Sequence, residues 1–179
     1  MTSRRLVWLA PLALALATAG CGRSAKEEAA GAYCPRPFSV QDADRLTRFR
    51  AGAGRDPRDV VFDAALLGSS TTCSIKGNVM EVLLVIRMSA NAGPALGNSG
   101  VTSVPYFVRV LDQGNRVAQG FEDIADFRLT PTKPRASGNV EVTVKLPFAR
   151  PSDLASYGIA VGLKPTPEEL QYNRRAAAR

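Results

Sequence analysis

The sequence predicts a mainly β fold, an antiparallel sandwich of seven or eight strands with a short N-terminal helix and a C-terminal helix. Two observations lead to this prediction. Apolar and polar residues alternate in several short segments after Val60, a period that is typical of strands with one buried face. Breaks rich in Gly, Pro, Asn and Asp separate these segments, and no long helical pattern lies between them.

The first residues have the pattern of a secretory signal peptide. Arg4 and Arg5 precede an uncharged apolar run at 6–19, and this run of about 14 residues is too short to cross a bilayer, which needs roughly 20. Small residues end the run, as they do in cleaved signals. We therefore expect 1–20 to be a signal peptide. The stretch 3–8 also resembles a twin-arginine export signal, but the strongly apolar core favours ordinary export.

The end of the signal, Ala19-Gly20-Cys21, looks like a bacterial lipobox. This resemblance implies that Cys21 carries the lipid and becomes the first residue of the mature chain. Thr18 replaces the leucine that is usual in this motif, and ordinary cleavage after Ala19 remains the alternative. Gly22 stands where many inner-membrane lipoproteins have aspartate, so the resemblance favours an outer-membrane anchor facing the periplasm.

The chain has three cysteines, an odd number for an exported protein. If Cys21 carries lipid, Cys34 and Cys73 are left to form a disulfide in an oxidising compartment. The alternative is a pair of buried free thiols.

Four regions follow from these patterns. Residues 1–20 are the expected signal peptide and 21–33 the lipidated cysteine with a flexible tether. Residues 34–165 form the expected β-sandwich domain, and 166–179 the C-terminal helix. Inside the domain, Ser39 is the expected cap of the short N-terminal helix, because Ala43, Leu46 and Phe49 recur at three-residue spacing.

The strands are predicted from their apolar patterns. Val140–Leu146 alternates most clearly, and Tyr106–Val110 and Tyr157–Leu163 behave similarly. Val79–Met88 is more continuously apolar, as expected of a central strand. The segment 111–117 predicts a hairpin. Ser89–Gly100 predicts a long loop, a common place for a binding element, although its composition suits plain disorder equally well.

The segment Leu154–Leu163 resembles the tyrosine corner of fibronectin type III and other immunoglobulin-like domains. A leucine is followed three residues later by Tyr157 and then by alternating apolar residues. The resemblance implies an immunoglobulin-like sandwich in which the Tyr157 hydroxyl bonds to backbone upstream and locks the crossover between the sheets. A strand that simply starts with tyrosine is the alternative.

The C-terminal helix has strong local start signals. Thr166 is the expected cap, Pro167 takes the first helical position and Glu169 completes a capping box. Because Leu170 and Asn173 share one face, we expect the helix to pack lightly on the sandwich. The helix either caps the end of the domain or binds a partner, and the sequence leaves both alternatives open.

Composition argues against most enzyme classes. Histidine is absent, which removes the Ser-His-Asp triad and the usual zinc, copper and iron sites. Glu122, Asp123 and Asp126 match no ion-binding loop, so we interpret them as a solvated strand connection, and no catalytic residue, metal or cofactor is predicted. The formal charge is +7, but the arginine-rich stretch 42–59 also carries aspartates, and with export this argues against nucleic acid.

The sequence therefore predicts a non-catalytic, lipid-anchored cell-envelope protein. We expect the membrane to be contacted through the N-terminal lipid, and another envelope protein through a strand edge, the 89–100 loop or the final helix. The alternative is a periplasmic module that binds a lipid or glycan ligand. The absence of tryptophan outside the signal argues against stacking on sugars.

Overall fold

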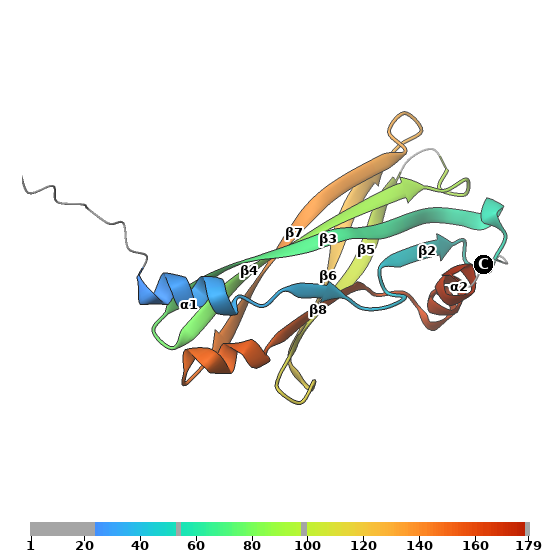
Figure 1. Cartoon of the computed structure of the whole chain (residues 1–179). Helices are drawn as coiled ribbons and strands as arrows, with labels where there is room; N and C mark the ends of the chain where they lie inside the picture. The colour runs from blue at the N-terminus through green and yellow to red at the C-terminus, as the bar shows by residue number, and fades with distance from the viewer. Residues whose placement is uncertain (1–23, 53–54, 98–99, 178–179) are drawn as a thin grey trace, which may run out of the picture.

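Two four-stranded sheets packed face to face form the body of the protein (Figure 1). The computed structural model describes residues 24–52, 55–97 and 100–177. The expected signal peptide and Cys21 lie outside these residues. Neither helix in the described part has the length and apolar character needed to cross a membrane.

The described residues contain eight strands, two α-helices and two short 3₁₀ helices. The helices are α1 (Ala25–Tyr33), η1 (Pro57–Asp59), η2 (Pro151–Ser156) and α2 (Pro167–Ala177). The strands are β1 (Pro37–Ser39), β2 (Arg45–Phe49), β3 (Val60–Lys76), β4 (Val79–Ala92), β5 (Gly100–Leu111), β6 (Val117–Leu129), β7 (Arg135–Pro147) and β8 (Gly158–Leu163).

The strand order is β1-β8-β5-β6 in one sheet, here called sheet A, and β2-β3-β4-β7 in the other, sheet B. The predicted sandwich is confirmed, and most pairs are antiparallel. Sheet A is mixed, however, because β1 runs parallel to β8. The last two strands lie in opposite sheets, whereas the last two strands of an immunoglobulin constant domain share one. The resemblance to that class therefore does not extend to strand order.

The core lies between the sheets and is built by alternation along long strands. On β4, the side chains of Met80, Val82, Leu84, Ile86 and Met88 are completely buried. Between them, Leu83 points outward and is 38% exposed. Because β4 pairs with β3 on one side and β7 on the other, the prediction of a central strand here is confirmed.

The prediction of a helix after Ser39 is wrong, because Arg45–Phe49 form strand β2. Asp42, expected in the first helical turn, has a φ of 62°, a left-handed conformation that a helix cannot contain. Pairing with β3 places Leu46 opposite Ala64 and buries it completely. Burial in the core therefore decides the conformation of a segment whose local pattern favoured a helix.

The flexible tether expected at 21–33 is also corrected, because nine of its residues form helix α1. The Ser24 hydroxyl accepts from the Glu27 amide at 3.3 Å, and the Glu27 carboxylate accepts from the Ser24 amide at 2.9 Å. This reciprocal capping box starts the helix. The short N-terminal helix of the predicted fold thus exists, but in different residues.

The expected loop at Ser89–Gly100 is shorter than predicted, because β4 continues to Ala92. At the strand end, the Gly93 amide donates to the Val61 carbonyl at 2.8 Å. A Cβ on Gly93 would overlap the Val60 carbonyl, so the close approach of these backbones requires glycine. The first part of the segment is therefore paired strand.

The junction between β7 and β8 carries the predicted tyrosine contact. The Tyr157 hydroxyl donates to the Pro147 carbonyl at 2.9 Å. Pro147 ends β7 in sheet B, and Tyr157 directly precedes β8 in sheet A. The expected hydrogen bond to upstream backbone at the crossover is thus confirmed.

Candidate functional site

The outer face of sheet A is the first candidate, because exposed apolar side chains lie along it. Among the described residues, six large hydrophobic side chains are exposed. Four of them belong to sheet A: Phe38, Val101, Val117 and Ile124. Strand register places all four on the side away from the core, since their neighbours Val104, Tyr106 and Val108 point inward. We call the surface formed by these four residues and Phe107 the apolar face of sheet A.

Helices leave this face open in the described chain. α1 packs against β3 and η2, and α2 packs against β2, so both lie over other parts of the body (Figure 1). Ile124 is consequently 58% exposed and Phe38 48% exposed. The five side chains are spread along the sheet rather than clustered, because Val101 and Val117 lie at opposite ends of the β5–β6 pair. Exposed apolar side chains that share one face of a domain are a feature of surfaces that bind another molecule.

A charged group lies at the centre of the apolar face. The Glu122 carboxylate is paired with both Arg109 and Lys164. Hydrogen bonds from Lys164 first, and then from Arg109, lower the pKa of Glu122. The Arg109 guanidinium lies 5.2 Å from the centre of the Phe107 ring, a cation–π arrangement that holds both side chains in place.

Gly162 makes room for the Phe107 ring. A Cβ at this position would lie 2.5 Å from Cζ of Phe107, so a larger residue would push the ring away. The aromatic ring covers backbone that the glycine leaves bare. Sheet A therefore presents a fixed aromatic and arginine pair, two residue types that are enriched in protein interfaces.

The acidic residues singled out in the sequence belong to this sheet but form no common site. They lie within strand β6 rather than in a connection, which corrects that interpretation. Asp126 accepts from the Ser103 hydroxyl at 2.7 Å, and Asp123 accepts from the Ile124 amide at 2.8 Å. Glu122 and Asp126 occupy one face of the strand and Asp123 the other, so their carboxylates do not converge.

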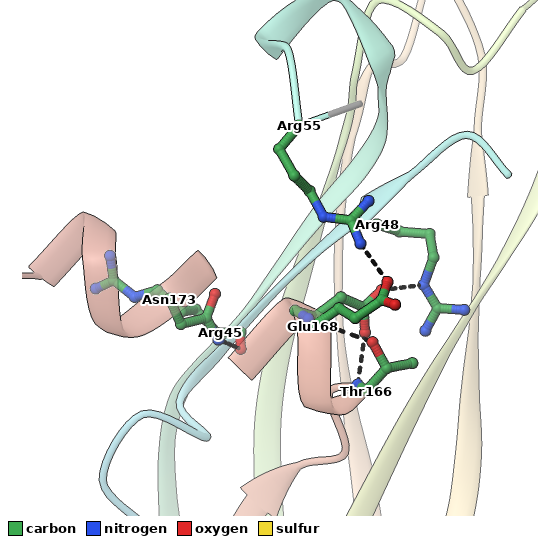
Figure 2. A network of polar contacts seen from close by, with 7 residues as sticks. Arg45, Arg48, Arg55, Thr166, Glu168 and Asn173 are labelled. Carbon is green, nitrogen blue, oxygen red and sulfur yellow. Dashed lines mark hydrogen bonds and ion pairs between the residues drawn. The ribbon is translucent and has the colours of Figure 1, made fainter. Parts of the chain in front are cut away.

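The second candidate is a polar cluster that fastens α2 to β2 (Figure 2). The predicted capping box is confirmed, because the Thr166 hydroxyl accepts from the Glu169 amide at 3.3 Å and the Glu169 carboxylate from the Thr166 amide at 2.8 Å. Oε1 of Glu169 also lies 2.6 Å from Nε of Arg48. That N–H does not point at the oxygen, so the contact is an ion pair rather than a directed hydrogen bond.

Asn173 and Glu168 complete the attachment of α2. The Asn173 amide donates to the carbonyls of Asp42 at 3.1 Å and Arg45 at 2.8 Å. Glu168 pairs with Arg55 beside the chain segment that leads to η1. The expected light packing is therefore wrong, since Glu169 and Asn173 are buried and bind main-chain and charged groups.

The hollow near the α2 cluster has a volume of 590 Å³ and is lined by Arg48, Arg50 and Arg55 together with Glu168 and Glu169. Two of the three arginines are already paired with the two glutamates. Both glutamates are thus neutralised by ion pairs, and the geometry of the cluster explains how the helix is held rather than a reaction.

The third candidate surrounds the disulfide. Cys34 and Cys73 are bonded with a Cα–Cα distance of 5.7 Å, which confirms the predicted pairing. The bond joins the end of α1 to β3. A hollow of 730 Å³ lies beside it, between the first turns of α1 and the Thr71–Ile75 segment. The Thr71 hydroxyl on its wall is already bonded to the Pro35 carbonyl at 2.8 Å.

Within the described residues, His, Cys, Asp and Glu side chains form no group of three that would hold a metal ion. Comparison with protein-family models, curated proteins and solved structures gives no match. The interpretation of the sites therefore rests on their own geometry.

The apolar face of sheet A was not predicted from the sequence. Val117 and Ile124 lie seven residues apart on β6, a spacing that would place them on opposite faces of a regular strand. Only the strand register, with its irregularity at Val110/Leu111, shows that both face the same way as Val101 on β5. A signal for the missed α1 was present, because Ser24 and Glu27 have the spacing of a capping box.

Proposed function

We propose that this protein is a non-catalytic, lipid-anchored component of the cell envelope that binds another envelope protein. The apolar face of sheet A carries the proposal. It combines exposed aliphatic side chains with Phe107 and Arg109, and burial of such a surface by a partner is favourable. The lipid at Cys21 would place this face in the periplasm, with the outer membrane favoured.

The relationship to immunoglobulin-like domains is proposed only for the two-layer architecture. The Tyr157 hydrogen bond supports it, because it joins two sheets at a strand crossover as the tyrosine corner does.

A capture experiment tests the binding face. The folded chain from residue 22 is immobilised and exposed to a detergent extract of the envelope, and the retained proteins are compared between variants. Ile124→Ser together with Phe38→Ala should abolish retention of a protein that the unchanged chain captures. Leu67→Ser is the matched control, because Leu67 is 55% exposed but belongs to sheet B.

Two results contradict the proposal. If both variants captured the partner protein equally well, the apolar face would not take part in the interaction. Retention of lipid or glycan, with no protein, would favour a ligand-binding module instead. Circular dichroism of each variant shows that the fold is retained.

Intact mass spectrometry tests the anchor. Membrane-extracted protein should begin at Cys21 and carry added acyl mass, and Cys21→Ser should release the chain from the membrane. A soluble chain that begins at Gly20 would instead indicate ordinary cleavage after Ala19.

A further inference from the structure

The start of α1 lies very close to the proposed lipid attachment. Only Gly22 and Arg23 separate Cys21 from Ser24, the cap of the helix. Three residue steps of fully extended chain span at most about 10 Å. A lipid at Cys21 therefore holds Ser24 within that distance of the membrane surface, an argument that rests on the lipid anchor of the proposed function.

α1 adds little reach, because the disulfide that follows it holds its C-terminal end against the sandwich. Its C-terminal residue Tyr33 is followed by Cys34, which is bonded to Cys73 on β3. At the other end of the helix, Ser24 and Lys26 line the same hollow as Ser74 and Ile75. The helix start thus lies beside the turn between β3 and β4, and η2 also packs against α1 (Figure 1).

These contacts define one end of the body, formed by the first turn of α1 and the β3–β4 turn at 76–79. Its exposed groups are polar and of both signs, with Lys26, Lys76 and Asn78 beside Glu27 and Glu28 of the first helical turn. Lys76 is paired with Glu81 at 2.6 Å. A polar surface of mixed charge suits contact with zwitterionic lipid headgroups rather than insertion among the acyl chains, where buried charges are costly.

We propose that this end of the sandwich docks directly on the lipid headgroups of the membrane that holds the anchor. α2 and the turn between β6 and β7 lie at the other end of the body (Figure 1). They therefore point away from the bilayer, and the apolar face of sheet A stands on the side of the docked domain, open to a partner. The protein binds its membrane through a fixed surface and not through a loose tether.

The lysines provide a test without added labels. The chain has five lysines, and Lys26 and Lys76 lie at the docked end while Lys133 lies in the β6–β7 turn. All three are exposed in the protein alone. The acylated full-length protein is bound to the outside of phosphatidylethanolamine–phosphatidylglycerol vesicles, acetylated with a membrane-impermeant reagent and analysed by peptide mass spectrometry. The reference is the Cys21→Ser protein in solution.

We expect acetylation of Lys26 and Lys76 to fall several-fold on the vesicles, with Lys133 unchanged. The matched variant carries twelve Gly and Ser residues inserted between Arg23 and Ser24, which adds a flexible reach of about 19 Å. It keeps the anchor and the folded domain but should restore acetylation of Lys26 and Lys76 to the level of the soluble reference.

Flotation of the vesicles separates the two proposals. Protein that floats with the vesicles but shows equal acetylation at both ends overturns the docking surface and leaves the anchor intact. Protein that neither carries acyl mass nor floats overturns the anchor, and the docking surface with it.

Discussion

Loss of the disulfide should weaken the whole domain and release α1. The bond closes a loop of 39 residue steps, for which the chain-entropy model gives about 4 kcal/mol of stabilisation. Since single domains are stable by only about 5–15 kcal/mol, this is a large part of the total. The perturbation is the double substitution Cys34→Ser and Cys73→Ser in the chain from residue 22, which has no third cysteine to interfere.

The effect on α1 should exceed the effect on the sheets. The helix has nine residues and buries only Ala30, and isolated helices below about 12 residues are marginal in water. Without the bond to β3, little else holds it. Hydrogen exchange of the α1 amides should therefore become fast under conditions in which the β4 amides remain protected.

Urea unfolding measures how much stability the whole domain loses. For an m-value of about 2 kcal/mol per molar urea, a loss of 4 kcal/mol lowers the midpoint by about 2 M. Ser24→Ala is the local control, because it removes the capping hydroxyl and costs α1 about 1 kcal/mol without touching the sheets. It should speed α1 exchange and leave the midpoint in place. A double-serine variant with an unchanged midpoint would refute the entropic argument.

Three further predictions concern the core, the C-terminal helix and the charged group on sheet A. Leu84→Ala should lower the free energy of unfolding by about 2–5 kcal/mol, measured in urea, because Leu84 is completely buried on the central strand; a change below 1 kcal/mol would mean that this site collapses freely. Asn173→Ala should destabilise the protein by about 1–3 kcal/mol, because the Asp42 and Arg45 carbonyls lose their donor, whereas Gln171→Ala on the exposed side of α2 should have little effect. Because the pKa of Glu122 lies below its ordinary value of 4.5, its ion pairs stabilise the fold above pH 4.5, and this contribution disappears as pH falls through the lowered pKa. The melting temperature of Glu122→Gln should accordingly lie below that of the unchanged protein near neutral pH and converge with it in acid; a constant difference would contradict the assignment.

Features with a local cause were predictable from the sequence. Val140–Leu146 alternates because one side of a strand meets the core, and the structure places it in β7. The capping box of α2 depends only on Thr166 and Glu169, three residues apart. The pairing of Cys34 with Cys73 followed from the number of cysteines and the expected export.

Other features depend on distant partners, and local patterns misled the prediction. The segment 45–49 has helical spacing, but pairing with β3 and burial of Leu46 outweigh that weak preference. α1 contains its own start signal, but a helix this short also needs a partner outside it. Cys34, directly after the helix, is bonded to Cys73, which lies 39 positions further along the chain. The burial of Glu169 likewise follows from Arg48, which β2 brings to the helix.

The sequence by itself determined several strand segments, the capping box of α2 and the disulfide pair, because each depends on neighbouring residues or on residue counts. Only the tertiary structure decided which strands share a sheet, the parallel pairing of β1 with β8 and the common outward direction of Phe38, Val101, Val117 and Ile124. The physical reason is that hydrogen bonding between strands can pair many segments of similar composition. The choice among these pairings is made by the burial of all the strands together.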